Sequence, residues 1–198
     1  MNRYLIKIIL LFFVTQFVSG QTKSNLEMIN GLLDSSATEI KNKTEEFDNT
    51  YFFSIIMPSE YQVLDSRVVT SLVKKNIRLE QDSLQTNKIN YSISQVTVSY
   101  PNLFRDGIFG DYFLERNVIL SGSYSIQNSS VLSIANTFNY EVTDTIKYND
   151  LTFAENSSIP FTKGNVPPSP LFPSLVEPVI AITTVAVTVI LFFSVRSK

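Results

Sequence analysis

Between Val179 and Val195 the chain carries no charged residue, and Ile, Val, Leu and Phe make up most of this run. At about 1.5 Å of rise per residue, a helix over these 17 positions would be about 25 Å long, close to the roughly 30 Å of a bilayer's hydrocarbon core. Two basic residues follow within three positions, and basic residues beside a membrane span stay on the cytoplasmic side. We therefore predict a transmembrane helix over 176–195 and a cytoplasmic stub over 196–198.

Three other interpretations of this run stay open. A GPI signal ends on its hydrophobic tail, whereas basic residues follow the run here. A bacterial C-terminal sorting signal shares the order of short motif, apolar helix and basic end, and Val176-Glu177-Pro178 partly resembles the Val-Pro-Glu-Pro motif of exosortase substrates. A buried helix of a soluble domain fits less well, because the run has no amphipathic face.

The first twenty residues have the pattern of a secretory signal peptide. Basic residues at Arg3 and Lys7 precede an apolar stretch, and the small residues Ser19 and Gly20 follow it. We predict a signal peptide over 1–20, removed after Gly20, with an uncleaved N-terminal anchor as the alternative. The absence of Cys and the Gly-Gln cleavage site indicate a bacterial chain. The signal peptide and the basic residues after the apolar run together predict that the domain lies in the periplasm and is held at the bacterial inner membrane.

The composition excludes several classes of function. The chain has no Cys, no His and no Trp, so a Cys nucleophile, a Ser-His-Asp triad and His or Cys zinc sites are impossible. Residues 21–170 hold 12 basic against 17 acidic residues, which argues against nucleic-acid binding. No Gly-rich phosphate loop occurs. We expect no enzyme activity, no cofactor and no metal.

Apolar spacing predicts helices at 25–47 and 59–75, separated by a buried strand over Tyr51–Met57. Ser59 and Gln62 fit a capping box at the start of the second helix. Asn76 is expected to end that helix, and Ile77–Leu79 to form a brief strand.

Longer strands follow. Ile89 to Ile93 alternate in one phase and Val96 to Tyr100 in the other, which predicts a bulge near Ser94-Gln95. Pro101 is expected to end this strand, and residues 102–110 to form a loop. A hairpin is predicted over 115–127 and 131–142.

The predicted fold is therefore α+β: two helices packed on a mainly antiparallel sheet of four to five strands, plus one C-terminal transmembrane helix. The domain covers 21–145. A Pro-rich tether over 146–175 joins it to the membrane, although the apolar residues of this segment indicate that part of it packs on the domain.

The element order from Leu26 to Val142 resembles the small α/β periplasmic domain of FlgO-like flagellar proteins, curli-secretion lipoproteins and the TolB N-terminal domain. No diagnostic motif accompanies it, and the Cys that some of these relatives carry as a lipidation site is absent here. The resemblance implies envelope assembly or scaffolding instead of catalysis.

Aromatic and charged residues gather around the predicted 102–110 loop. Aromatic side chains on a loop can anchor a protein partner, and the alternative is that they cover the open end of the sheet. The candidate partner-binding residues are Phe104, Phe109, Asp111, Tyr112, Phe113, Glu115 and Arg116. The three charged residues, Asp111, Glu115 and Arg116, could instead form a solvated strand end with a surface ion pair.

Two smaller clusters are candidates for a calcium site and for a contact between membrane helices. Asp144, Asn149, Asp150 and Glu155 could supply oxygen ligands to Ca²⁺, but their spacing does not match an EF-hand. In the apolar run, Ala181, Thr184 and Thr188 share one face that could contact another membrane helix, or the two Thr hydroxyls could bond to their own helix.

We therefore predict a single-pass, membrane-anchored envelope protein that acts as a non-enzymatic interaction or scaffold subunit of an envelope or secretion assembly. One alternative is an extracytoplasmic ligand-binding or sensing module. Another is a surface protein with a processed C-terminal sorting signal.

Overall fold

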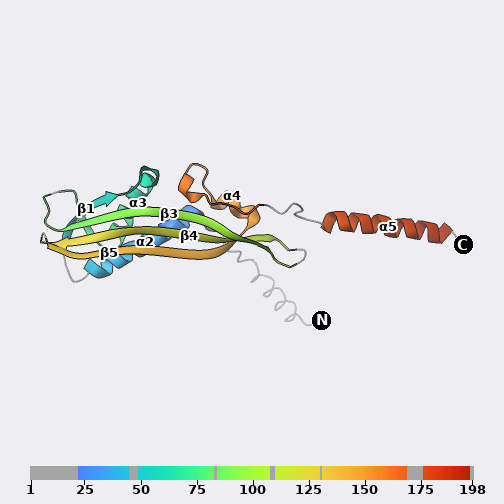
Figure 1. Ribbon diagram of the computed structural model, residues 1–198, viewed down its shortest axis with the longest axis horizontal. Coiled ribbons are helices and arrows are strands. Elements are labelled where there is room, and N and C mark those ends of the chain that lie inside the picture. The colour runs from blue at the N-terminus through green and yellow to red at the C-terminus, as the bar shows by residue number, and fades with distance from the viewer. Residues whose placement is uncertain are drawn as a thin grey trace, which may run out of the picture.

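The computed structural model describes residues 22–44, 49–82, 84–107, 110–129, 131–168 and 176–196. The fold is α+β, with a five-stranded sheet in the order β2-β1-β3-β4-β5, and α2 passes behind the long strands in Figure 1. The elements are α2 (Asn25–Thr44), β1 (Thr50–Ile56), η1 (Ser59–Leu64), α3 (Asp65–Lys74), β2 (Arg78–Glu80), β3 (Lys88–Arg105), β4 (Tyr112–Asn128), β5 (Val131–Lys147), η2 (Tyr148–Asp150), α4 (Leu151–Ala154), η3 (Pro160–Thr162) and α5 (Val176–Arg196). The predicted α+β class is confirmed, and the five strands lie within the predicted four to five.

The sheet is mixed: the long strands form the predicted antiparallel part, and β1 adds parallel pairing that was not predicted. Strand β1 pairs in parallel with both β2 and β3, whereas β3, β4 and β5 pair antiparallel. Parallel neighbours need a crossover connection, and η1 with α3 supplies the one between β1 and β2. The periodicity identified the helix but not the direction of the strand that follows it.

The three long strands exceed their predicted lengths. The predicted bulge is confirmed, because the β3–β4 register shifts between Ile93 and Gln95. Pro101 does not end β3, which continues to Arg105; the prediction of a strand end there is wrong. Pro101 is exposed and lies within a second register shift, between Ser99 and Asn102, where a missing backbone N–H costs the ladder little. The hairpin likewise extends to Tyr112 and Lys147.

Helix α2 begins with a capping box that we had not predicted. The Ser24 backbone N–H donates to Glu27 Oε2 at 2.7 Å, and the Glu27 N–H donates to Ser24 Oγ at 3.2 Å. The box predicted at Ser59 is absent, since Pro58 precedes η1 and no side chain caps it. Asn76 follows α3 with φ of 61°, which confirms it as the left-handed residue that stops that helix.

The core lies between the sheet and the helices. The apolar residues of α2 that recur at three- and four-residue spacing are buried against β4 and β5, and α3 packs beside α2. Asp34 of α2 ties the two helices together, because it accepts from Arg67 Nη2 and from Ser71 Oγ, each at 2.7 Å.

Residues 151–166 lie on the domain, inside the segment that we predicted to be a tether. Phe161 packs edge-on against Tyr61 with ring centroids 5.4 Å apart, and Thr162 is completely buried. Asn165 then forms a parallel bridge with Ser99 of β3. The chain therefore stays attached to the sheet for about twenty residues after β5.

Helix α5 occupies the place of the predicted transmembrane helix, and its described apolar side chains are exposed. In the parts of the chain that the structure describes, no helix meets the length and hydropathy needed to cross a membrane. The transmembrane helix of the predicted fold is therefore unsupported by the structure. The predicted signal peptide over 1–20 lies outside the described residues.

Candidate interaction surface

The turn between β3 and β4 brings the predicted aromatic residues together. We call the described residues 104–107 and 110–113 the tip. The rings of Phe104 and Phe113 stack with centroids 6.0 Å apart, and Phe104 is 47% exposed. The Arg105 guanidinium lies 5.1 Å from the Tyr112 ring centroid, a cation–π contact. Of the four predicted aromatics, Phe104 and Phe113 stack, Tyr112 contacts Arg105 instead, and Phe109 falls outside the described residues.

Backbone and side-chain bonds hold the tip closed. The Asp106 N–H donates to the Asp111 carbonyl at 3.0 Å, and Arg105 Nε donates to the Gly110 carbonyl at 2.9 Å. Gly107 has φ of +68°, a conformation that glycine adopts without steric cost. The aromatic pair is therefore presented by a tight, bonded turn.

The three predicted charged residues do not form one group. Successive residues of a strand point to opposite faces, so Glu115 and Arg116 separate: Glu115 accepts from Asn102 Nδ2 at 2.6 Å on the exposed face, and Arg116 is completely buried. Asp111 instead pairs with Lys147 at 2.9 Å, and the hydrogen bond and charge of Asp111 raise the pKa of Lys147. The surface-pair interpretation holds for Asp111, with a different partner.

Arg116 is the centre of a buried polar network. Its Nε and Nη2 donate to the two oxygens of Asp144 at 2.7 and 2.5 Å, and its Nη1 donates to the Lys23 carbonyl at 2.7 Å and to Asn25 Oδ1 at 2.8 Å. A guanidinium can be buried when its donors are satisfied in this bidentate way. This network fixes the start of α2 against β4 and β5.

Asn25 extends the same network to the rest of the fold. Its Nδ2 donates to Tyr100 Oη at 2.8 Å and to the Thr162 carbonyl at 2.7 Å. Burial raises the pKa of Tyr100 to about 12, although the bond from Asn25 opposes the rise. Residues 23–25 and 162–165 are thereby joined to one end of the sheet, the end that carries the tip.

A second polar cluster surrounds Glu39 on α2. Tyr124 Oη donates to its Oε1 at 2.8 Å, Asn136 Nδ2 donates to the same atom at 2.7 Å, and Tyr140 Oη donates to its Oε2. Partial burial raises the pKa of Glu39, but these three bonds outweigh it and hold the pKa below its usual value. Burial and the bond to Glu39 raise the pKa of Tyr140.

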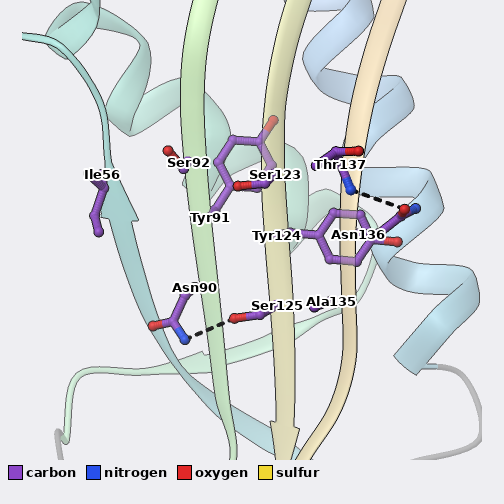
Figure 2. Close-up of a pocket in the computed structure, with 10 residues that line it drawn as sticks. All are labelled: Ile56, Asn90, Tyr91, Ser92, Ser123, Tyr124, Ser125, Ala135, Asn136 and Thr137. Atoms are coloured by element: carbon purple, nitrogen blue, oxygen red, sulfur yellow. Dashed lines mark hydrogen bonds between the residues drawn. The ribbon is translucent and has the colours of Figure 1, made fainter.

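The face of the sheet opposite the helices is lined by small, uncharged polar side chains around a hollow of about 510 Å³. Figure 2 looks onto this open face, with the helices behind the strands and Asn90 bonded to Ser125. The hollow is lined by Ile56, Asn90, Tyr91, Ser92, Ser123, Tyr124, Ser125, Ala135, Asn136 and Thr137. It crosses β1, β3, β4 and β5. The hollow was not predicted from the sequence, although Ser121, Ser123 and Ser125 recur at every second position of β4, the period of one strand face.

The acidic residues considered for Ca²⁺ have separate roles. Asp144 binds Arg116, Asp150 accepts from Thr22 Oγ1 at 2.8 Å, and Glu155 accepts from the Gly164 N–H at 2.9 Å. Across the described residues, no group of three or more acidic side chains is placed to hold a metal ion.

On α5, the Thr184 hydroxyl donates to the Ile180 carbonyl at 2.7 Å and the Thr188 hydroxyl to the Thr184 carbonyl at 2.8 Å. These are bonds within one helix. The predicted contact face of Ala181, Thr184 and Thr188 stays a prediction.

No protein-family model and no curated protein matches the chain. Several solved structures are similar to it, among them two bacterial lipoproteins. A minor lipoprotein from Acinetobacter baumannii is 14% identical with a TM-score of 0.33, covering 50% of this chain and 68% of that one. The rare lipoprotein B from Shewanella oneidensis is 16% identical with a TM-score of 0.32, covering 50% and 69%. Neither is a FlgO-like, curli-secretion or TolB protein, so that particular resemblance stays a prediction. At these TM-scores neither likeness bears on what this chain does.

Proposed function

We propose that this protein is a non-enzymatic interaction subunit of a bacterial envelope assembly, and that the tip is the surface that binds its protein partner. One observation carries the proposal. The aromatic tip lies at the same end of the sheet as Lys23, which bonds to Arg116, and Asn165, which pairs with Ser99. Lys23 and Asn165 are thus bonded to β4 and β3, the two strands whose connecting turn carries the tip.

The proposal includes a membrane anchor at 176–195. The described side chains of α5 between Val179 and Phe193 are apolar apart from three threonines, and those exposed include Ile182 at 69% and Ile190 at 67%. A helix that is apolar on every side needs an apolar environment. In the proposed topology the domain is periplasmic and the anchor lies in the inner membrane.

A short connection would hold the domain near the membrane. Seven residues separate Pro168 from Val176, and an extended chain covers at most about 3.6 Å per residue. The anchor would therefore keep Pro168 within about 30 Å of the membrane. Phe104 and Phe113 are rigid, stacked anchors of the kind that carry binding energy at protein interfaces.

The experiment is affinity purification of the tagged full-length protein from membranes of its own host. We expect partner recovery to fall at least tenfold in the Phe104→Ser/Phe113→Ser variant. The matched control is Phe153→Ser, because Phe153 is 54% exposed on α4 and lies outside the tip. Equal recovery of the partner by both variants, with unchanged melting temperatures, would show that the tip is not the partner-binding surface.

Anchoring is tested separately with a C-terminal tag. The proposal predicts a tagged species that lacks residues 1–20 and stays in the inner-membrane fraction after carbonate washing. Loss of the tag from a released, shortened chain would instead identify 176–198 as a sorting signal.

A second candidate function is binding of a small uncharged polar ligand in the hollow of the open face. Its hydroxyl and amide lining, with Ile56 68% exposed at one side, suits such a ligand. Filling the hollow with Ser123→Trp should abolish binding of any metabolite that co-purifies with the protein. The same substitution should leave partner recovery through the tip unchanged.

A further inference from the structure

A cleft of about 480 Å³ lies between α3 and the part of the sheet that β1 and β2 form. Val69 and Val73 of α3 line one side of it, and the apolar residues of the other side are Phe53, Ile55 and Leu79. None of these five side chains is fully buried, and Val73 is 53% exposed. We call this feature the β1 cleft.

Helix α3 presents two different apolar faces. Val68 and Leu72 are buried in the core, whereas Asp65, Val69 and Val73 recur at four-residue spacing along the cleft. From Asp65 to Val73 the helix rises by about 12 Å, which is the length of about four extended residues. The second face is therefore not used by the core, and it is long enough to accompany a short strand.

The backbone of β1 is also unpaired beside the cleft. Strand β2 pairs with β1 only as far as Phe52, whereas β1 continues to Ile56. The Phe52 N–H donates to the Asn87 carbonyl at 2.9 Å, on the β3 side, and successive residues of a strand direct their backbone groups to opposite edges. The N–H and carbonyl of Ile55 therefore point to the outer edge, where, among the described residues, no strand pairs with β1 beyond Phe52.

Unpaired strand backbone beside an apolar cleft is the arrangement by which proteins bind an extended peptide as an added strand. Backbone hydrogen bonds supply affinity in that mode, and pockets for alternate side chains supply selectivity. Here the outer edge of β1 at Ile55 offers the backbone groups. Val69, Val73 and Leu79 form the apolar walls for alternate side chains of the peptide.

The charge of the cleft indicates the kind of peptide. Both charged residues that line it in the described part of the chain, Asp65 and Glu80, are acidic and exposed. Glu80 Oε2 accepts a hydrogen bond from the uncharged Gln85 Nε2 at 3.1 Å, so its negative charge is retained. Complementary charge across an interface steers association and selects the partner, which favours a peptide with a basic residue.

From these features we propose that the β1 cleft binds an extended peptide of a partner protein as a strand added to the outer edge of β1. The peptide has apolar residues at alternate positions and at least one Lys or Arg. This site goes beyond the proposed function, because β1 pairs with the first residues of β3, Lys88 to Ser92, whereas the tip begins at Phe104. Either site can therefore fail while the other stands.

The test is selection of random heptapeptides, displayed on phage, against the immobilised full-length protein in detergent. We expect the enriched peptides to have alternating apolar residues and a Lys or Arg, and to bind at least tenfold more weakly to Val73→Arg, which fills the cleft and repels a basic residue. The matched control is Val63→Arg, because Val63 is 56% exposed in η1 and lies outside the cleft. Its affinity for the same peptides should stay within twofold of the wild type.

Two further measurements test the charge and the backbone pairing. Glu80→Lys should weaken binding of the basic peptides at least fivefold, whereas Glu60→Lys, which changes an exposed acid outside the cleft, should not. N-methylation of alternate peptide amides should abolish binding in one of the two possible phases, because an added strand donates from every second residue. The bound peptide should also slow hydrogen exchange of the Ile55 amide.

Three results would overturn the proposal. The first is that no peptide is enriched, or that the enriched peptides bind equally to the wild type and to Val73→Arg. The second is an affinity that N-methylation leaves unchanged in both phases, because the peptide would then not pair as a strand. The third is a wild-type dimer, seen by light scattering, that Val73→Arg dissociates, since the cleft would then be occupied by a second copy of this chain.

Discussion

The guanidinium of Arg116 is completely buried, and its Nη2 lies 2.5 Å from Oδ2 of Asp144. The pair joins β4 to β5, and Arg116 also holds the chain at Lys23 and Asn25. One side chain thus connects the start of α2 to two strands. The conformation of the tip end of the domain depends on it.

We predict that Asp144→Ala lowers the free energy of unfolding by about 3 kcal/mol, because it leaves a buried charge without its counter-ion. Urea denaturation followed by circular dichroism measures the loss. Asp111→Ala is the control: Asp111 and Lys147 are both more than half exposed, and exposed pairs contribute less than about 1 kcal/mol. Similar losses in the two variants would contradict the burial of Arg116.

Glu39 should make the free energy of unfolding depend on pH in the acidic range. Its pKa is lower in the folded protein than its usual value of 4.5, so its stabilising contribution is complete above pH 4.5 and is lost as the pH falls through the folded pKa. We expect Glu39→Gln to be less stable than the wild type at pH 7, and the difference in free energy of unfolding to shrink below pH 4.5. A difference that stays constant from pH 7 to pH 3 would show that the carboxylate charge is not what Tyr124 and Asn136 stabilise.

Two glycines should respond in opposite directions to alanine. A Cβ on Gly122 would lie 2.1 Å from the Ser92 carbonyl oxygen and 2.5 Å from the Phe138 ring, whereas nothing lies within 4 Å of a Cβ on Gly31. Gly122→Ala should therefore destabilise by about 1–3 kcal/mol through overpacking. Gly31→Ala, inside α2, should stabilise by about 0.5–1 kcal/mol. Thermal melting compares the two, and a neutral Gly122→Ala would contradict the close approach of β3, β4 and β5.

Local patterns in the sequence predicted several elements well. The phase change between Ile93 and Val96 located the bulge in β3, and Asn76 located the end of α3, because each is a local feature with one structural solution. The parallel direction of β1 was not predicted, and the prediction that Pro101 ends β3 was wrong. Both depend on which neighbour the strand meets, and no short stretch of sequence contains that information.

In the candidate site, too, groups of residues close in the chain were predicted, whereas contacts between distant residues were not. The aromatic residues around the turn were identified because they are close in the chain, and Phe104 and Phe113 do stack. The buried role of Arg116 was missed because its partners, Asn25 and Asp144, lie 91 and 28 residues away. The Glu39 cluster was missed for the same reason, since its partners Tyr124, Asn136 and Tyr140 come from distant strands.

The most direct test of the account is site-specific photocrosslinking in cells with a photoreactive residue at position 104 or 123. These positions report on the tip and on the open face. We predict a covalent adduct with a different envelope protein from position 104 and none from position 123. Absence of an adduct at 104, together with a foreign protein crosslinked at 123, would contradict the tip as the partner-binding surface and would assign that role to the open face.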